Sequence, residues 1–330
     1  MSYRHIPAMV NEVLGFLNCR PGSICVDGTL GGCGHARAIC ERIVPDGLLI
    51  GIDQDIDAIS NAETILKDYS SNIHLFHGNF IRLPDFLKQL NIDGVDGILL
   101  DLGLSQNQIE NSGRGFSFRK DEPLDMRMDI RSPQTAAMLV NKLSQSELQK
   151  LLWEYGEERR ARQIAKNIVR SRRRQKIRTS RQLAQIVIES MPPGTASKQK
   201  IHPATRAFMA LRIAANRELE RLETFLEHAV DLLNPGGRLC VLAFHSLEDR
   251  IVKQRFKSLE KGCSCAPRLP RCVCGQKPQL RLLTKKVVRP TAAEVIANPM
   301  ARSTRLRAAE KLEIAAQMNT DKQGIQASKG

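Results

Sequence analysis

A glycine-rich segment flanked by acidic residues is the first part of the chain that could carry chemistry. Four glycines fall between Asp27 and His35, directly after the apolar run 24–26. Glycines let a backbone turn tightly and approach a ligand closely. Asp53 follows the next apolar run, at the spacing where a carboxylate accepts hydrogen bonds from ribose hydroxyls. A nucleoside-containing ligand is therefore predicted, and a tight turn with a capping aspartate is the alternative.

Two cofactor classes fit such a loop. A dinucleotide fingerprint would read G-x-G-x-x-G at the pyrophosphate. Asp27 at the strand end should repel a pyrophosphate but tolerate a cationic amino-acid group, which favours S-adenosylmethionine. Asp101 ends another apolar run and is placed to meet either the cofactor or the group being methylated. Phe80 could pack on the adenine ring, or it could be an ordinary core residue.

A basic segment points to a polyanionic partner. From Arg159 to Arg181 the chain holds 11 Lys or Arg residues and no Asp or Glu, and the whole chain carries a net charge of +15. A solvated helix face usually mixes both signs, so this segment favours phosphate contacts over a membrane-facing role. Aromatic residues make up only 4%, which argues against extended base stacking. Five basic residues share one predicted helix face: Arg159, Arg162, Lys166, Arg170 and Arg173.

The nine cysteines do not suggest a disulfide framework, because their number is odd and no secretion signal precedes them. Four of them form a cluster in a Pro- and Gly-rich loop: Cys263, Cys265, Cys272 and Cys274. Four thiolates suit tetrahedral zinc, but structural sites more often use C-x-x-C pairs. A loop of reduced or redox-active thiols stays open. The cysteines in apolar contexts are expected in the core: Cys19, Cys25, Cys40 and Cys240.

The elements that must position these residues alternate in type. With 330 residues, 42% of them hydrophobic, the chain is long enough for two domains and is not disordered. Strands are predicted at 24–26, 48–52, 73–76 and 97–100, with helices ending at 43 and spanning 56–66 and 83–90. Continuous apolar strands that alternate with helices indicate a parallel sheet covered on both faces.

This alternation stops between residues 107 and 212, where no convincing strand occurs. It resumes with a helix at 218–233, a strand at 239–244, a helix at 246–256, and short strands at 280–283 and 304–307. The prediction is one α/β domain, residues 1–106 and 213–316, interrupted by a helical insertion at 107–212 and followed by a polar tail at 317–330. No apolar run approaches the roughly 18 residues of a spanning helix, so a cytoplasmic protein without membrane contact is expected.

Taken together, these residues resemble the MraW/RsmH family. The matches run from His5 to about Lys311, nearly the whole chain. They comprise Asp27 to Thr29, Gly34-His35, Asp53, Asp101 to Ser105, Gln108, Arg114 to Phe118, Pro123 to Met128, Tyr155 to Arg159, His202 to Arg206, Phe244 to Arg250, Asn298-Pro299 and Ala301 to Ser303.

The resemblance implies a Rossmann-like, S-adenosylmethionine-dependent methyltransferase domain interrupted by a helical RNA-recognition domain. It implies methylation of the exocyclic N4 amine of one cytosine in 16S ribosomal RNA, in the decoding region of the small subunit. Cofactor contacts are implied at Cys33, Gly34, His35, Asp53, Phe80, Asp101 and Gln108. Cys33 stands where the family usually has glycine, and a positive φ there would strain it. Gln106-Asn107 replaces the common Ser-Pro, which affects the shape of that loop.

A cytosine amine is a poor nucleophile because it is conjugated with the ring. Such an enzyme must align nitrogen, methyl carbon and sulfur, and must supply a hydrogen-bond acceptor to the amine. Asp101 is expected to be that acceptor or orienter, with the backbone carbonyls of 102–105. The Asp/Asn-Pro-Pro-aromatic motif of many amino-methyltransferases is absent, so this assignment depends on position. Phe116 and Phe118 could cover a splayed-out base, or they could pack locally.

Further RNA contacts are expected at Arg206 and His245, although His245 could equally be a hydrogen-bonded structural residue. Ser246 with Asp249 is expected to cap a helix. Asp125 and Arg127 could fix a loop or touch RNA. Two other functions stay open. One is a catalytically silent RNA-binding assembly factor, which affinity for S-adenosylmethionine would disfavour. The other is a nicotinamide-dependent oxidoreductase, which nicotinamide binding would support.

Overall fold

A single seven-stranded sheet organises the chain. The computed structural model describes residues 7–192, 194, 201–263, 265 and 274–313. The strand order is β3-β2-β1-β4-β5-β7-β6. Strands β1 to β5 run parallel, and β7 is antiparallel to both β5 and β6. The strands are β1 Ile24–Asp27, β2 Leu48–Asp53, β3 Ile73–His77, β4 Val95–Asp101, β5 Leu233–Ala243, β6 Leu280–Leu282 and β7 Arg305–Lys311.

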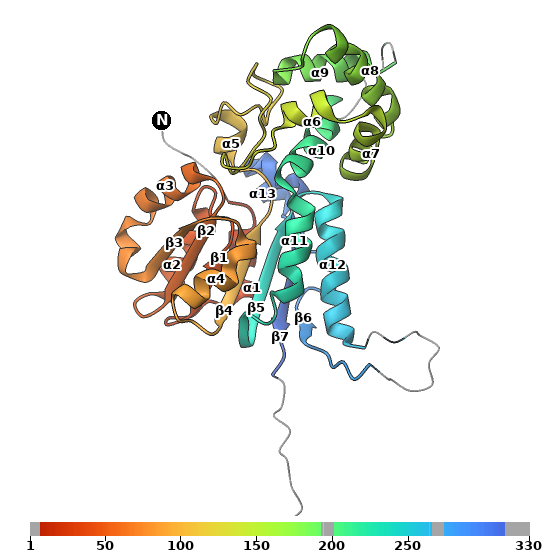
Figure 1. The fold of residues 1–330 in the computed structure, drawn as a ribbon. Helices are drawn as coiled ribbons and strands as arrows, with labels where there is room; N and C mark the ends of the chain where they lie inside the picture. The colour runs from red at the N-terminus through yellow and green to blue at the C-terminus, as the bar shows by residue number, and fades with distance from the viewer. Residues whose placement is uncertain (1–6, 193, 195–200, 264, 266–273, 314–330) are drawn as a thin grey trace, which may run out of the picture.

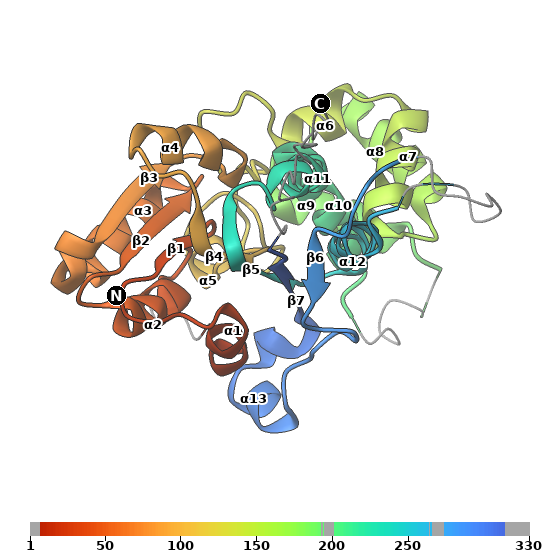
Figure 2. The ribbon, with the colours of Figure 1, turned by 90° about the horizontal axis from the view of Figure 1, so that it is seen from below.

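Helices cover both faces of this sheet, which confirms the predicted α/β class. Because the central strands are buried on both sides, they read as nearly unbroken apolar runs. Figure 2 shows the three layers, with α4, α11 and α12 on one side and α1 and α2 on the other. The covering helices are α1 Val10–Leu17, α2 Gly34–Ile43, α3 Ile56–Ile65, α4 Leu83–Gln89, α11 Glu218–His228 and α12 Ser246–Lys261.

A second, all-helical body rises from the carboxyl edge of the sheet (Figure 1). Its buried residues form their own apolar cluster, from Phe116 to Ala215. The predicted apolar stripe of its basic helix points inward, with Ile164 and Ile168 completely buried. The helices are α5 Gln106–Glu110, α6 Ala136–Lys142, α7 Gln145–Gly156, α8 Ala161–Arg174, α9 Ser180–Glu189 and α10 Ala204–Asn216. Short elements complete the described chain: η1 Lys67–Asn72, η2 Phe80–Arg82, α13 Ala292–Ala297 and η4 Pro299–Ser303.

Two element predictions need correction. The helix predicted to reach residue 233 ends at His228, and β5 already begins at Leu233. The turn residues 234–237 lie within this strand, where the pairing with β4 shifts register between Val95 and Gly97. The irregular pairing accommodates a Pro-Gly-Gly sequence that a regular ladder would exclude. The helix α1 was not predicted at all.

Candidate functional site

A large cavity lies at the carboxyl ends of the parallel strands, where the strand order reverses between β1 and β4. Ligands of open α/β sheets bind at this switch point. The cavity encloses about 1130 Å³ and is walled by residues 29–32 and 34 and by segments 102–105, 116–119 and 297–301. Small-molecule sites commonly measure about 300–1,000 Å³. The space therefore admits a cofactor together with part of a second substrate.

The glycine loop between β1 and α2 forms the floor of this cavity. A Cβ on Gly28 would lie 2.5 Å from Leu100 Cδ2, and one on Gly34 would lie 2.5 Å from Pro7 Cγ. Larger residues at these two positions would push the loop out of place. The loop folds so tightly because glycine is present where the backbone meets its neighbours.

Cys33 adopts the left-handed conformation that would be relaxed for a glycine and is strained for a cysteine. Its φ is 62° at the N-terminus of α2, and its side chain is buried. Asn61 Nδ2 donates to the sulfur at 3.6 Å, and burial raises the pKa of the thiol to about 12. The residue does not line the cavity. A side-chain contact between Cys33 and a cofactor is therefore not supported.

Asp27 also lies beneath the loop rather than facing the cavity. Its carboxylate accepts a hydrogen bond from the Thr29 N–H at 3.1 Å. Burial raises its pKa to about 6, although the nearby His35 acts in the opposite direction. Asp27 supports the loop from below.

Asp53, at the end of β2, reaches the cavity as predicted. Its carboxylate accepts hydrogen bonds from the Gly31 N–H at 2.9 Å and from the Asp55 N–H at 2.8 Å. Burial nevertheless raises its pKa to about 7. The group can therefore change its charge near neutral pH while it holds the glycine loop.

Asp101 and His35 meet at the centre of the cavity wall. The His35 Nδ1 lies 3.4 Å from Asp101 Oδ2, and its Nε2 lies 2.9 Å from the Ala8 carbonyl oxygen. Both ring nitrogens face acceptors, so the doubly protonated ring satisfies both contacts. Burial lowers the pKa of His35, but Asp101 outweighs it and the pKa is raised overall.

The other oxygen of Asp101 has no partner. Asp101 Oδ1 is buried and accepts no hydrogen bond within the described residues. The backbone N–H of Asp101 donates to Thr29 Oγ1 at 2.6 Å, which fixes the residue in place. A buried acceptor without a donor is costly and is usually satisfied by a ligand or water. Asp101 lines the cavity, and Oδ1 is the carboxylate oxygen that is left to accept a further hydrogen bond.

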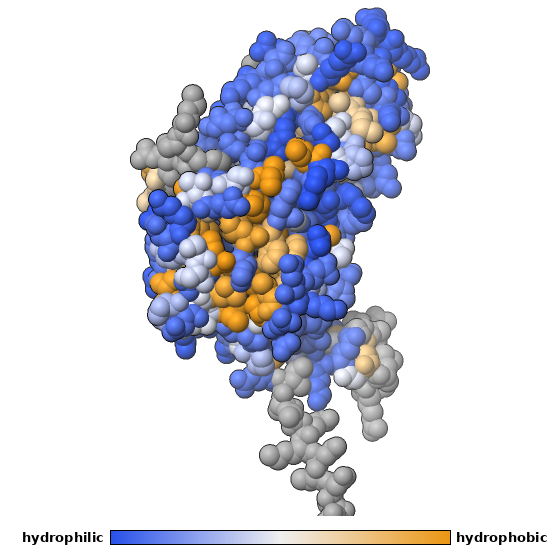
Figure 3. Space-filling view, turned by 60° about the vertical axis from the view of Figure 1, so that its left-hand side comes forward, coloured by the Kyte–Doolittle hydropathy of each residue, from blue (hydrophilic) through white to orange (hydrophobic). Residues whose placement is uncertain are grey.

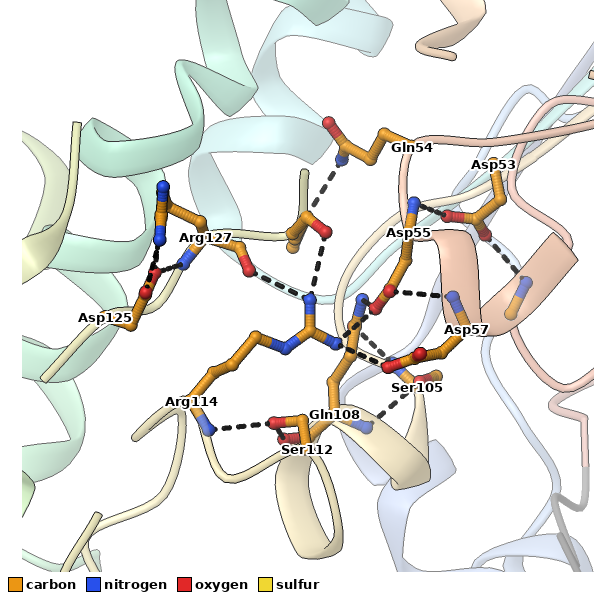
Figure 4. Close-up of polar contacts among 12 residues, drawn as sticks. Asp53, Gln54, Asp55, Asp57, Ser105, Gln108, Ser112, Arg114, Asp125 and Arg127 are labelled. Carbon is orange, nitrogen blue, oxygen red and sulfur yellow. Dashed lines mark hydrogen bonds and ion pairs between the residues drawn. The ribbon is translucent and has the colours of Figure 1, made fainter. Parts of the chain in front are cut away.

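Gln108 lies in the cavity wall, but its polar groups are already engaged (Figure 4). Its Nε2 donates to Asp55 Oδ2 at 2.8 Å, and its Oε1 accepts from the Ser105 N–H at 3.0 Å. Ser105 and Gln108 together form the capping box that starts α5. With Gln106-Asn107 in place of the common Ser-Pro, α5 is therefore still well capped.

Arg114 completes this network from the insertion. Its Nη2 lies 2.5 Å from Asp55 Oδ2, and its Nη1 donates to the Arg127 and Met128 carbonyls at 3.1 and 3.0 Å. The sequence alone assigned no role to either Asp55 or Arg114. The only hint in the sequence was that Arg114 begins the motif 114–118, which resembles a motif of the MraW/RsmH family.

The aromatic candidates divide into two groups. Phe80 is buried in the sheet core, edge-on to Phe225, and lines a small neighbouring cavity rather than the large one. The two cavities share Thr29, Gln54, Leu102 and Gly103, so the contact of Phe80 with adenine stays a prediction. Phe116 and Phe118 do line the large cavity. The Phe118 ring stacks on His202 with 4.1 Å between centroids, so local packing also holds it.

The basic face of α8 is exposed as predicted. All five predicted side chains are solvent-exposed, but Arg159 lies in the turn before the helix, so four of them are on α8: Arg162, Lys166, Arg170 and Arg173. The top of the molecule, which the insertion forms, is mostly hydrophilic (Figure 3). The helix α8 lies beyond the carboxyl edge of the sheet (Figure 1), and the cavity is at the same edge. The basic face of α8 can offer several cations to one polyanion.

The other residues considered for RNA contact make polar contacts within the protein. His245 is buried, and its Nε2 lies 3.0 Å from Glu248 Oε1, so its ring is not presented to a partner. Its side chain caps α12, where the sequence analysis expected Ser246 to be the cap. Arg206 is half-buried, and its Nη1 lies 3.4 Å from the Glu157 carbonyl. Arg127 donates twice to Asp125, both at 2.7 Å, and the pair fixes its loop.

The cysteines follow their predictions in part. Cys25, Cys40 and Cys240 are buried in the core, whereas Cys19 is half-buried. Cys263, Cys265 and Cys274 lie close together, and Cys272 falls outside the described residues. No helix in the described ranges is long and apolar enough to span a membrane.

The family model and the similar relatives identify one family. The model of the MraW methylase family matches residues 2–312. The chain is 54% identical over 309 residues to ribosomal RNA small subunit methyltransferase H of Desulforapulum autotrophicum, covering 94% of this chain and 99% of the relative. The protein of the same name from Desulfosudis oleivorans is 54% identical over 312 residues, covering 94% and 100%. A solved rRNA methylase from Streptococcus thermophilus is far more distant, with a TM-score of 0.41 and 12% identity over 94% of this chain and 100% of that one.

Proposed function

The chain belongs to the MraW methylase family, and on that premise we propose that it methylates the N4 amine of one cytosine in 16S ribosomal RNA. The methyl donor is S-adenosylmethionine, and the target lies in the decoding region of the small subunit. The relatives' shared name, ribosomal RNA small subunit methyltransferase H, supports the substrate class. An enzyme that modifies ribosomal RNA works where ribosomes are made, so we place it in the cytoplasm.

The cavity suits S-adenosylmethionine by its chemistry. Asp53 offers a carboxylate at the end of β2, the position from which ribose hydroxyls are bound in such sheets. The glycine loop brings its backbone to the cavity wall at Gly31 and Gly34. When bound, the cofactor supplies an electrophilic methyl carbon. The predicted cofactor residues that line this space are Gly34, His35, Asp53, Asp101 and Gln108.

The unpartnered Asp101 Oδ1 is the observation on which the proposal rests most. His35 donates toward Oδ2 and keeps the carboxylate oriented, so Oδ1 of this cavity-lining residue is left without a donor among the described residues. An amine N–H of the target cytosine would satisfy it. A carboxylate acceptor increases the electron density on that nitrogen and is positioned to receive its proton. In this role Asp101 is the catalytic residue.

The helical insertion serves as the RNA-recognition unit in this proposal. Residues 1–106 and 213–316 make the catalytic domain, and residues 107–212 present the basic face. Phosphate contacts position a nucleic acid without reading its sequence. Ser117 and Phe118 belong to the insertion and line the cavity, so an RNA held on the insertion can deliver a base to Asp101.

Transfer of labelled methyl groups tests this proposal. Wild-type protein is incubated with labelled S-adenosylmethionine and, separately, small ribosomal subunits, naked 16S RNA and DNA. Label in ribosomal RNA, and none in DNA, is expected. A catalytically silent assembly factor would bind RNA and leave every acceptor unlabelled, which would overturn the proposal. A nicotinamide enzyme would bind the nicotinamide cofactor instead of S-adenosylmethionine.

A further inference from the structure

Three thiols beyond the end of α12 lie close enough to share one metal ion. The ligand atoms of Cys263, Cys265 and Cys274 lie within 4.8 Å of one another. The Sγ atoms of Cys263 and Cys274 are 3.7 Å apart. Thiolates around tetrahedral zinc, with Zn–S of about 2.3 Å, are separated by about 3.8 Å. A disulfide would instead bring its sulfurs to about 2.05 Å.

The fold itself brings the two arms of this loop together. The helix α12 ends at Lys261, and Gly262 turns the chain with φ at 70° while its N–H donates to the Ser258 carbonyl. The Gln279 N–H donates to the Leu259 carbonyl at 2.9 Å. A Cβ on Gly262 would lie 2.3 Å from Pro278 N, so the returning arm packs directly on the helix end. The two arms of the loop are therefore held together at Gly262 and Pro278, close to Cys263 on one arm and Cys274 on the other.

Another group of possible ligands in the described residues is already neutralised. Glu218, His245 and Glu248 lie near one another. Arg212 pairs with Glu218 at 2.8 Å, and Glu248 accepts hydrogen bonds from the start of α12. A cation there would have to displace a guanidinium. The three thiols offer a different donor chemistry, because soft thiolates select zinc over magnesium or calcium.

We propose that Cys263, Cys265 and Cys274 bind one zinc ion as thiolates. Three protein ligands leave one position of the tetrahedron for a fourth donor. The 16 residues of α12 separate this site from the cavity by about 24 Å at 1.5 Å per residue. The ion therefore takes no part in methyl transfer. It closes the loop between α12 and β6 and stabilises that end of the domain.

Metal analysis of the intact protein tests this inference independently of methyl transfer. The full chain is purified with reductant and without chelators, and its zinc is measured by mass spectrometry. We expect about one zinc per chain in the wild type, as one thiolate site binds one ion. Cys263→Ser and Cys274→Ser should each lose most of it. Cys19→Ser is the matched control, because this cysteine lies elsewhere and should leave zinc unchanged.

Cobalt substitution gives a second readout on the same protein. Thiolate-to-cobalt charge transfer should appear when Co²⁺ is added to metal-free wild type, and it should weaken in Cys263→Ser. The proposal is overturned if wild type keeps no zinc and shows no cobalt–thiolate absorption. It is also overturned if both loop variants keep full zinc, or if Cys263 and Cys274 are found joined as a disulfide in the protein kept under reductant.

Discussion

The Arg114 guanidinium lies 2.5 Å from the Asp55 carboxylate, and this bond joins the helical insertion to the end of β2. The two side chains are only 10% and 3% exposed. Gln108 donates to the same carboxylate at 2.8 Å. We call this buried ion pair between Arg114 and Asp55, with its additional bond from Gln108, the latch; it connects the helical insertion to the sheet domain at the cavity (Figure 4).

Breaking that latch should destabilise the protein strongly. Arg114→Met leaves the buried Asp55 carboxylate without its cation, which costs about 3–5 kcal/mol of unfolding free energy. Urea denaturation followed by circular dichroism measures it. The matched control is Arg37→Met, which breaks an exposed pair with Glu41 and should cost about 0–1 kcal/mol. Equal costs for the two variants would show that the latch is not buried as described.

The left-handed backbone at Cys33 predicts an inverted preference for glycine. At an ordinary helix position glycine is less stable than alanine by about 0.5–1 kcal/mol. Since φ is 62° here, an alanine retains a strain of about 1–2 kcal/mol that a glycine avoids. Cys33→Gly should therefore unfold at a higher urea concentration than Cys33→Ala. The reverse order would contradict the conformation of this loop.

Cofactor affinity should rise between about pH 6 and pH 8. Burial raises the pKa of Asp53 to about 7, so its carboxyl ionises across this range and becomes a better acceptor for ribose hydroxyls. The ionised fraction grows about tenfold, which bounds the gain in affinity for S-adenosylmethionine. Isothermal titration calorimetry measures the gain.

The same ionisation should lower the stability of the cofactor-free protein as the pH rises. A carboxyl whose pKa is raised on folding stabilises most below its unfolded pKa of about 4, and this contribution is lost as pH rises through about 7. Asp53→Asn should flatten both pH dependences. An unchanged pH dependence of affinity in this variant would assign the effect to another group, such as Asp27.

The exposed basic face of α8 should set the salt dependence of RNA binding. Replacing Arg162, Lys166 and Arg170 by Gln removes up to three cations that can neutralise phosphates. The slope of log K against log salt should fall by about one for each phosphate that is no longer neutralised. Filter binding to 16S RNA at several salt concentrations measures the slope, while affinity for S-adenosylmethionine should not change.

A charge-matched variant controls for the lower net charge. Lys67, Lys88 and Lys257 are exposed and belong to η1, α4 and α12, outside the helical insertion. Their replacement by Gln lowers the net charge equally and should leave the salt slope nearly unchanged. If both triple variants weaken RNA binding alike, the basic face of α8 is not the contact surface.

The sequence pattern predicted the sheet because parallel strands that are buried on both faces consist of continuous apolar residues. It also placed Asp53 and Asp101 at the cavity, since the carboxyl ends of parallel strands lie along one edge of the sheet, and β2 and β4 both border β1 there. The end of the helix at His228 escaped prediction because tertiary pairing of β4 with Leu233 extended the strand instead.

Long-range polar contacts were not readable from the sequence. The Asp55–Arg114 pair spans 59 residues, and no local periodicity encodes such a distance. Phe80 was assigned to the ligand because it follows a strand. Whether such a side chain turns into the cavity or into the core depends on loop geometry, which becomes visible only in three dimensions.

The most direct test of the account locates the methyl group and asks whether Asp101 is needed to place it. Wild type and Asp101→Asn react with small subunits and 16S RNA, the RNA is digested to nucleosides, and mass spectrometry identifies the product. Binding of S-adenosylmethionine is measured for both proteins in parallel. We expect N4-methylcytidine at one position with wild type, and a rate of methyl transfer that is at least about 100-fold lower in the variant. Methylation of another base, or an undiminished rate in Asp101→Asn, would contradict it.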